Sequence, residues 1–74
     1  MNLLKAVEKQ TYVLKNIGND PHFARRAGSM GLIPGTEIRV IRNQTKMPVL
    51  LFARDTLIAV NQKDAAGIEV EAHV

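Results

Sequence analysis

Apolar residues recur at every second position in three short stretches of the chain. Ile38 and Val40 stand two positions apart, and a charged residue precedes each of them. A period of two places the apolar side chains on one face of a strand. This pattern predicts half-buried strands over residues 11–17, 36–42 and 68–72. In the first of these, Tyr12 and Leu14 share a face, whereas Ile17 has the opposite parity and indicates a bulge or a strand end nearby.

Two further predicted strands are apolar on both faces. They cover residues 49–53 and 56–61, and the short reversal Arg54-Asp55 separates them. A small barrel has a single interior, so one face of each strand is expected to point outward and to form an interaction surface. We expect this surface to bind a partner or a second copy of the chain, through Leu50, Phe52 and Leu57. The alternative is that other apolar residues cover these side chains, namely Leu3, Leu4, Phe23 or Met30.

A helix is expected between the first two strands. Asp20 is a suitable N-cap, and Pro21 fits the first helical position because its missing N–H is not needed there. The residues at helical spacing predict a packing face that ends with the helix; they are Phe23, Ala27 and Met30.

Three residues predict a structural turn after this helix. Gly31 can adopt the left-handed conformation that closes a helix. Pro34 presets φ for the second position of a turn, and Gly35 accepts the positive φ that a type II turn needs next. Single helical turns are also predicted over residues 62–66 and within the lead-in of residues 1–10.

Length and composition indicate one small β domain. The chain has 74 residues, so we assign residues 1–74 to a single domain. Five short strands in so few residues suggest a small, strongly bent barrel. The absence of cysteine excludes disulfides, thiolate metal ligands and a cysteine nucleophile. The sequence shows no secretory signal and no apolar run approaching the roughly 18 residues of a membrane span, so we expect a cytoplasmic protein that is not inserted in a membrane.

The charge distribution does not favour nucleic acid as a partner. The formal net charge is +3, but the basic residues are dispersed, and only Arg25 and Arg26 are adjacent. The aromatic residues are too few for a platform on which bases stack; they are Tyr12, Phe23 and Phe52. Arg25 and Arg26 could bind an acidic partner or a phosphate, and the alternative is a solvated helix face.

Candidate chemistry is sparse. Asp20 and His22 are weak candidates for metal ligands, because a metal site needs three or four converging groups and the other histidine, His73, lies near the end of the sequence. The alternative is that Asp20 is only a helix cap and His22 is solvated. We find no nucleophile with a neighbouring base and no glycine-rich phosphate loop, so we expect neither an enzyme nor a bound cofactor.

The order of these elements resembles the FeoA-like domain of the ferrous iron transport protein A family. The resemblance covers residues 4–72 and rests on Arg26-x-x-x-Met30-Gly31-Leu32, Pro34-Gly35-Thr36-Glu37-Ile38, Pro48-Val49-x-Leu51, Ile58-x-Val60 and Ala66-x-Ile68-x-Val70. It implies an SH3-like small β-barrel, mainly β, with a short helical insertion after the first strand. A related domain ends iron-dependent repressors of the diphtheria-toxin-repressor type.

The same resemblance implies a function in ferrous iron uptake. It implies a small cytoplasmic accessory protein, a non-enzymatic module that interacts with the cytosolic portion of ferrous iron transporter B, a membrane GTPase. Because apolar residues are expected to point outward, we also expect that the chain can form a homo-oligomer. The alternative is that the chain is an SH3-like module with a metal-responsive regulatory role, or one that binds nucleic acid.

Overall fold

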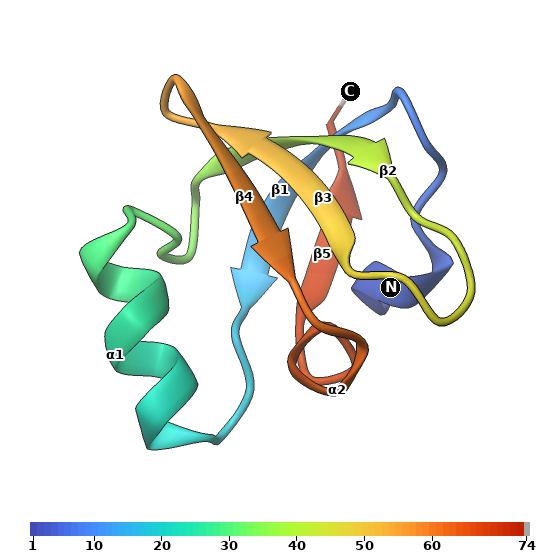
Figure 1. Cartoon of the computed structure of the whole chain (residues 1–74). Helices are drawn as coiled ribbons and strands as arrows, with labels where there is room; N and C mark the ends of the chain where they lie inside the picture. Colours follow the sequence, from blue (N-terminus) through green and yellow to red (C-terminus); the bar gives the residue numbers. More distant parts are fainter. Residues whose placement is uncertain (74) are drawn as a thin grey trace.

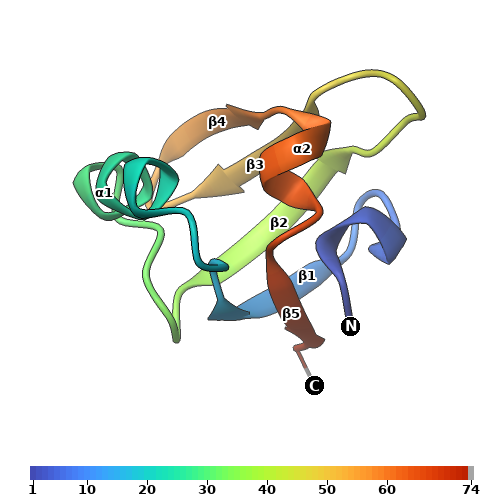
Figure 2. The ribbon, with the colours of Figure 1, turned by 90° about the horizontal axis from the view of Figure 1, so that it is seen from below.

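The computed structural model describes residues 1–73 as one bent antiparallel sheet with short helices at its ends. In chain order, the elements are η1 (Leu3–Lys5, a 3₁₀ turn), β1 (Thr11–Asn16), α1 (Pro21–Ser29), β2 (Glu37–Arg42), β3 (Val49–Ala53), β4 (Thr56–Val60), α2 (Gln62–Ala65) and β5 (Glu69–Ala72). The strand order is β4-β3-β2-β1-β5 (Figure 1). Figure 2 shows the sheet curling so that α1 and α2 lie on its inner side. Over these residues β4 and β5 do not pair with each other, so the sheet is strongly bent but open.

The predicted mainly-β architecture is confirmed, including the helix after the first strand. Each strand differs from its predicted range by at most one residue at either end. The irregularity expected near Ile17 is also present, because β1 ends at Asn16 and its register with β5 shifts between Leu14 and Asn16.

One hydrophobic core fills the inside of the bend. The inward-facing residues of β2, β3 and β4 are almost fully buried. They are Ile38, Val40, Val49, Leu51, Ala53, Ile58 and Val60. Phe23 and Ala27 of α1 extend this core on one side, and Leu3 of η1 extends it on the other. Met30 is 39% exposed, so its predicted place in the packing face is wrong. The helix ends at Ser29, which leaves Met30 as its C-cap.

The ends of α1 follow from local chemistry. Asp20 Oδ1 accepts hydrogen bonds from the backbone N–H groups of His22 (2.9 Å) and Phe23 (3.4 Å), and Pro21 is the first helical residue. At the other end Gly31 has φ = 84°, and the Leu32 N–H donates to the Ala27 carbonyl at 2.8 Å. Leu32 is the second residue after the C-cap, Met30, and Ala27 lies in the last helical turn. A hydrogen bond between these two positions defines the Schellman motif.

The predicted Pro-Gly turn is confirmed. The Thr36 N–H donates to the Ile33 carbonyl at 3.0 Å, and Gly35 has φ = 95°. Positive φ after proline is the geometry of a type II turn. The Gly35 N–H also donates to the Leu14 carbonyl at 2.7 Å, so the turn is attached to β1.

The reversal between β3 and β4 is a two-residue hairpin turn. Arg54 and Asp55 both have positive φ, 51° and 61°, as a type I′ turn requires. The Arg54 side chain lies against Gly31, where a Cβ would come within 2.5 Å of Arg54 Cδ. The hairpin therefore contacts the end of α1, and the positive φ of Gly31 is what favours glycine at this position.

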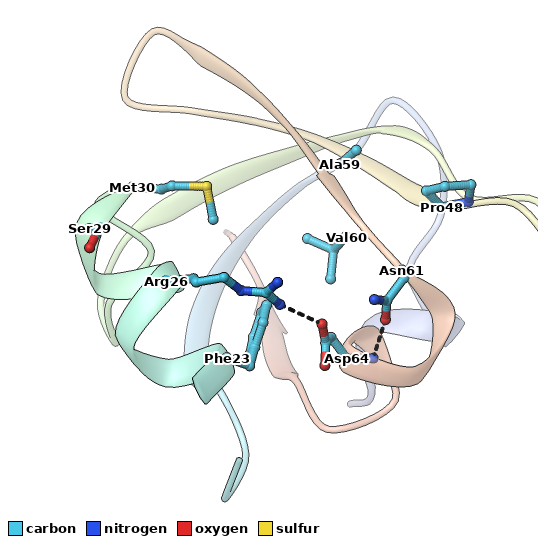
Figure 3. A pocket seen from close by; sticks show the side chains of 9 residues that line it. All are labelled: Phe23, Arg26, Ser29, Met30, Pro48, Ala59, Val60, Asn61 and Asp64. Atoms are coloured by element: carbon cyan, nitrogen blue, oxygen red, sulfur yellow. Dashed lines mark hydrogen bonds and ion pairs between the residues drawn. The ribbon is translucent and has the colours of Figure 1, made fainter. Parts of the chain in front are cut away.

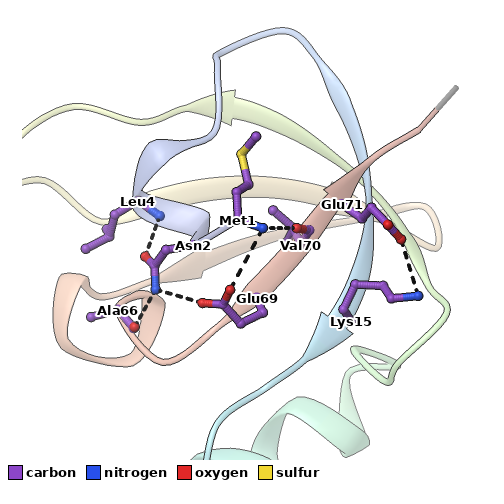
Figure 4. A network of polar contacts seen from close by, with 8 residues as sticks. All are labelled: Met1, Asn2, Leu4, Lys15, Ala66, Glu69, Val70 and Glu71. Carbon is purple, nitrogen blue, oxygen red and sulfur yellow. Dashed lines mark hydrogen bonds and ion pairs between the residues drawn. The ribbon is translucent and has the colours of Figure 1, made fainter.

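The N-terminal residues add a further short pairing outside β5 (Figure 4). The Met1 amine donates to the Val70 carbonyl at 2.7 Å, and the Val70 N–H donates back to the Met1 carbonyl at 2.7 Å. The Asn2 side chain donates to the Ala66 carbonyl at 2.6 Å and accepts from the Leu4 N–H at 3.0 Å. One edge of the sheet is thus covered by the chain itself.

No helix in the described part of the chain is long and apolar enough to cross a membrane.

Two glycine-to-alanine substitutions should have opposite effects on stability. Gly35→Ala is expected to lower the free energy of unfolding by about 1–2 kcal/mol, because alanine at φ = 95° is strained even though open space surrounds the position. Gly28→Ala, in α1 with nothing near its Cβ, should raise the free energy of unfolding by about 0.5–1 kcal/mol. Urea unfolding of both variants measures the difference, and equal effects of the two substitutions would contradict the conformational explanation.

Candidate functional site

The outer face of the β3–β4 hairpin carries exposed apolar side chains. Phe52 is 41% exposed and Leu57 is 59% exposed, and the two residues pair directly across the strands. Leu50 lies on the same outward face as Phe52, as expected, but is half-buried. It lies opposite Arg42, where the register between β2 and β3 shifts, and the strand is less regular there.

Arginines of β2 border these apolar residues. Arg39 pairs with Phe52, and Arg42 pairs with Leu50. Both arginines are exposed. We call Leu50, Phe52, Leu57, Arg39 and Arg42 the outer patch. A hollow of about 620 Å³ adjoins it and is lined by Phe52, Arg39 and Arg54, among others. An exposed apolar cluster with a basic border is suited to binding a surface with apolar and acidic groups.

The structure separates the roles of the two adjacent arginines. The Arg26 guanidinium lies 3.0 Å from Asp64 Oδ2 of α2, and its central carbon lies 5.7 Å from the centre of the Phe23 ring (Figure 3). The Asp64 side chain is only 12% exposed. Arg26 therefore links α1 to α2. Arg25 is exposed, with no ion pair or side-chain hydrogen bond among residues 1–73.

The metal candidates at the start of α1 lie close together, but Asp20 is used as the helix cap. His22 is exposed. The other histidine, His73, has its Nε2 3.2 Å from Glu37 Oε2 of β2. Within the described residues, no three side chains of His, Asp or Glu come together in a way that could hold a metal ion.

Sequence analysis missed a groove between α1 and β4. Its volume is about 540 Å³, and its apolar lining consists of Phe23, Met30, Pro48, Ala59 and Val60 (Figure 3). The ion pair of Arg26 and Asp64 and the side chains of Ser29 and Asn61 complete the walls. Because these residues come from separate parts of the chain, no local sequence pattern signals the groove.

Comparison with known proteins identifies the family. The family model of the FeoA domain matches residues 1–72. The chain belongs to the FeoA family. Among curated proteins, none is similar enough to this FeoA chain to count as a match.

Solved structures share the fold of this FeoA chain. A crystal structure of an iron uptake regulatory protein, FeoA, has a TM-score of 0.89 and 20% identity, covering 99% of this chain and 97% of that one. FeoA of Stenotrophomonas maltophilia in complex with zinc, described as a prokaryotic SH3 domain protein, has a TM-score of 0.82 and 21% identity, covering 96% and 89%. A manganese-dependent transcriptional repressor has a TM-score of 0.87 and 16% identity, covering 100% of this chain but 41% of the repressor. The fold is therefore SH3-like.

Removing the α1–α2 link should destabilise the FeoA chain modestly. We expect Arg26→Ala to lower the free energy of unfolding by about 1 kcal/mol, because it removes one partly exposed ion pair and one stacking contact. Arg25→Ala is the matched control and should change stability by less than about 0.5 kcal/mol. A double-mutant cycle with Asp64→Asn, measured by urea unfolding, isolates the coupling. Independent effects of the two substitutions would show that the pair contributes nothing.

We also predict that the chain alone binds metal weakly. Titration calorimetry with ferrous iron or zinc should give no binding tighter than micromolar, because Asp20 and His22 have no third ligand nearby within residues 1–73. A stoichiometric nanomolar site that His22→Ala abolishes would contradict this prediction.

Proposed function

We propose that this FeoA chain is a small cytoplasmic accessory protein of ferrous iron uptake. In this proposal it is a non-enzymatic module that docks on the cytosolic portion of the membrane GTPase that transports ferrous iron, ferrous iron transporter B. Family membership supports the role in iron transport. The Stenotrophomonas maltophilia relative is described as a candidate activating factor of bacterial ferrous iron transport, which is consistent with an accessory role.

The observation that carries the docking proposal is the outer patch. Phe52 and Leu57 are exposed neighbours on one face, and burying the apolar area that they still expose would favour binding. Arg39 and Arg42 stand beside them and would pair with acidic groups of the transporter, which favours encounter and correct orientation. Arg25, on α1, is proposed to add to this attraction from outside the patch.

The proposal predicts loss of docking when the outer patch is made polar. Phe52→Ser with Leu57→Ser should weaken binding to the purified cytosolic portion of the transporter at least tenfold, because the buried apolar area is lost. Both side chains are substantially exposed in the free chain, so its melting temperature should change little. Titration calorimetry and thermal melting measure the two quantities.

A matched control substitutes two exposed apolar residues outside the patch. Val7→Ser with Ile33→Ser removes residues that are 59% and 49% exposed and should leave binding unchanged. Equal affinity of the patch variant and the unmodified chain would contradict docking through this surface. The remaining possibility is that the outer patch mediates self-association. Sedimentation tests it: if the unmodified chain is a dimer and the patch variant is a monomer, the patch is a contact between two copies instead.

A metal-responsive regulatory or nucleic-acid-binding role is the second candidate. It is favoured by the same fold in part of a manganese-dependent transcriptional repressor. The outer patch combines one aromatic residue with two arginines, which is a small surface for stacking bases. Metal-dependent stabilisation or salt-dependent binding to mixed DNA would favour this role over docking.

A further inference from the structure

One end of the molecule is built from two segments that lie side by side. Residues 3–9 contain η1 and the turn before β1, and residues 43–47 belong to the loop between β2 and β3. The Asn43 side chain joins them, because its Nδ2 donates to the carbonyl oxygens of Leu4 (3.1 Å) and Ala6 (2.8 Å). In Figure 1 and in Figure 2, both segments lie at the opposite end of the molecule from α1. We call residues 3–9 and 43–47 the lysine end.

The lysine end carries a positive charge. Lys5, Lys9 and Lys46 are exposed, and none of them forms an ion pair among residues 1–73. The two segments contain one acidic residue, Glu8, whose Oε2 accepts a hydrogen bond from the Asn43 N–H at 2.7 Å. Three ammonium groups therefore face water with one carboxylate among them.

The acidic residues of the adjoining α2 and β5 do not neutralise these lysines, because each already has a cationic partner. The pairs are Asp64 with Arg26, Glu69 with the Met1 amine, and Glu71 with Lys15. The lysine end is thus complementary in charge to an anionic surface.

Exposed apolar side chains accompany the lysines. Val7 stands between Lys5 and Lys9 in the sequence, and Met47 follows Lys46; both are exposed. On a bilayer, such side chains enter the boundary between the headgroups and the acyl chains, while the lysines beside them contact anionic headgroups. The lysine end combines the two kinds of residue that this mode of binding uses.

The residue types favour a lipid surface over other anionic partners. Nucleic acid is bound through aromatic side chains on which bases stack, and the lysine end contains no aromatic residue. Arginine suits bidentate contacts with carboxylates and phosphates, and all arginines of the chain lie outside these segments. The groove and the hollow described above are lined by other residues, so neither offers a peptide a cleft at this end.

We propose that the lysine end binds the surface of an anionic lipid bilayer. Lys5, Lys9 and Lys46 contact the anionic headgroups, and Val7 and Met47 enter the interfacial region to a shallow depth. The chain lies on the bilayer and does not cross it. The lysine end shares no residue with the outer patch. The inference does not depend on the proposed docking, because vesicles that contain no transporter test it.

Co-sedimentation of the full chain with lipid vesicles measures this binding. The chain should bind vesicles of phosphatidylglycerol and phosphatidylcholine at least tenfold more tightly than vesicles of phosphatidylcholine alone. Added salt should weaken the binding, because it screens the charges. Equal binding to the two kinds of vesicle, or tighter binding to mixed-sequence DNA at the same salt concentration, would overturn the proposal.

Charge reversal at the two ends of the molecule locates the contact. Lys5→Glu with Lys46→Glu should weaken binding to the anionic vesicles at least tenfold. Arg25→Glu with Arg54→Glu is the matched control, because it changes the net charge equally at exposed positions outside the lysine end, and it should weaken binding less than about threefold. Thermal melting checks that each variant is folded. Equal losses for the two pairs would show that only net charge matters and would overturn the proposal.

Apolar substitutions separate a bilayer from a purely electrostatic partner. Val7→Ser with Met47→Ser should weaken binding to the anionic vesicles about fivefold, because these side chains no longer enter the interface. Met30→Ser with Ile33→Ser removes an equally exposed pair outside the lysine end and should bind as the unmodified chain does. Unchanged binding of the Val7 and Met47 variant would contradict a lipid surface as the partner and would overturn the proposal.

Discussion

The structure depends on burying one face of a short, strongly bent sheet. A chain of 74 residues removes only about 60% of its unfolded surface from water, so nearly all of its stability comes from a single small core. The bend brings the inner faces of β2, β3 and β4 together, and Phe23, Ala27 and Leu3 fill the open ends. Because one face is buried so completely, the outer face of the same strands remains in contact with water.

The segment that joins α1 to β2 fixes the position of the helix against the sheet. Gly31 and Gly35 both have positive φ, and the hydrogen bond from Gly35 to Leu14 attaches the turn to β1. Arg54 reaches over Gly31 from the β3–β4 hairpin. These contacts, together with the Arg26–Asp64 ion pair, hold α1 at a distance from β4 that leaves the groove between them.

The outer patch and the groove that result from this arrangement differ in physical character. The outer patch offers exposed side chains, so it is suited to a preformed surface with apolar and acidic groups. The groove offers an apolar lining between α1 and β4, with the Arg26–Asp64 ion pair in its wall. Both the outer patch and the groove lie on or beside the β3–β4 hairpin.

The sequence by itself determined the elements whose signals are local. Alternation placed the strands, Asp20 and Pro21 placed the start of α1, and the glycines placed the turns, because each depends on neighbouring residues only. The outward direction of Phe52 and Leu57 also followed, since a strand has a period of two. Tertiary structure alone decided the pairing of Arg26 with Asp64, which lies 38 positions away, and the resulting separation of Arg26 from Arg25. It also decided the cover of β5 by the N-terminal residues and the groove beside β4. These features join distant parts of the chain, and their geometry depends on how far the sheet bends, which no local pattern of residues encodes.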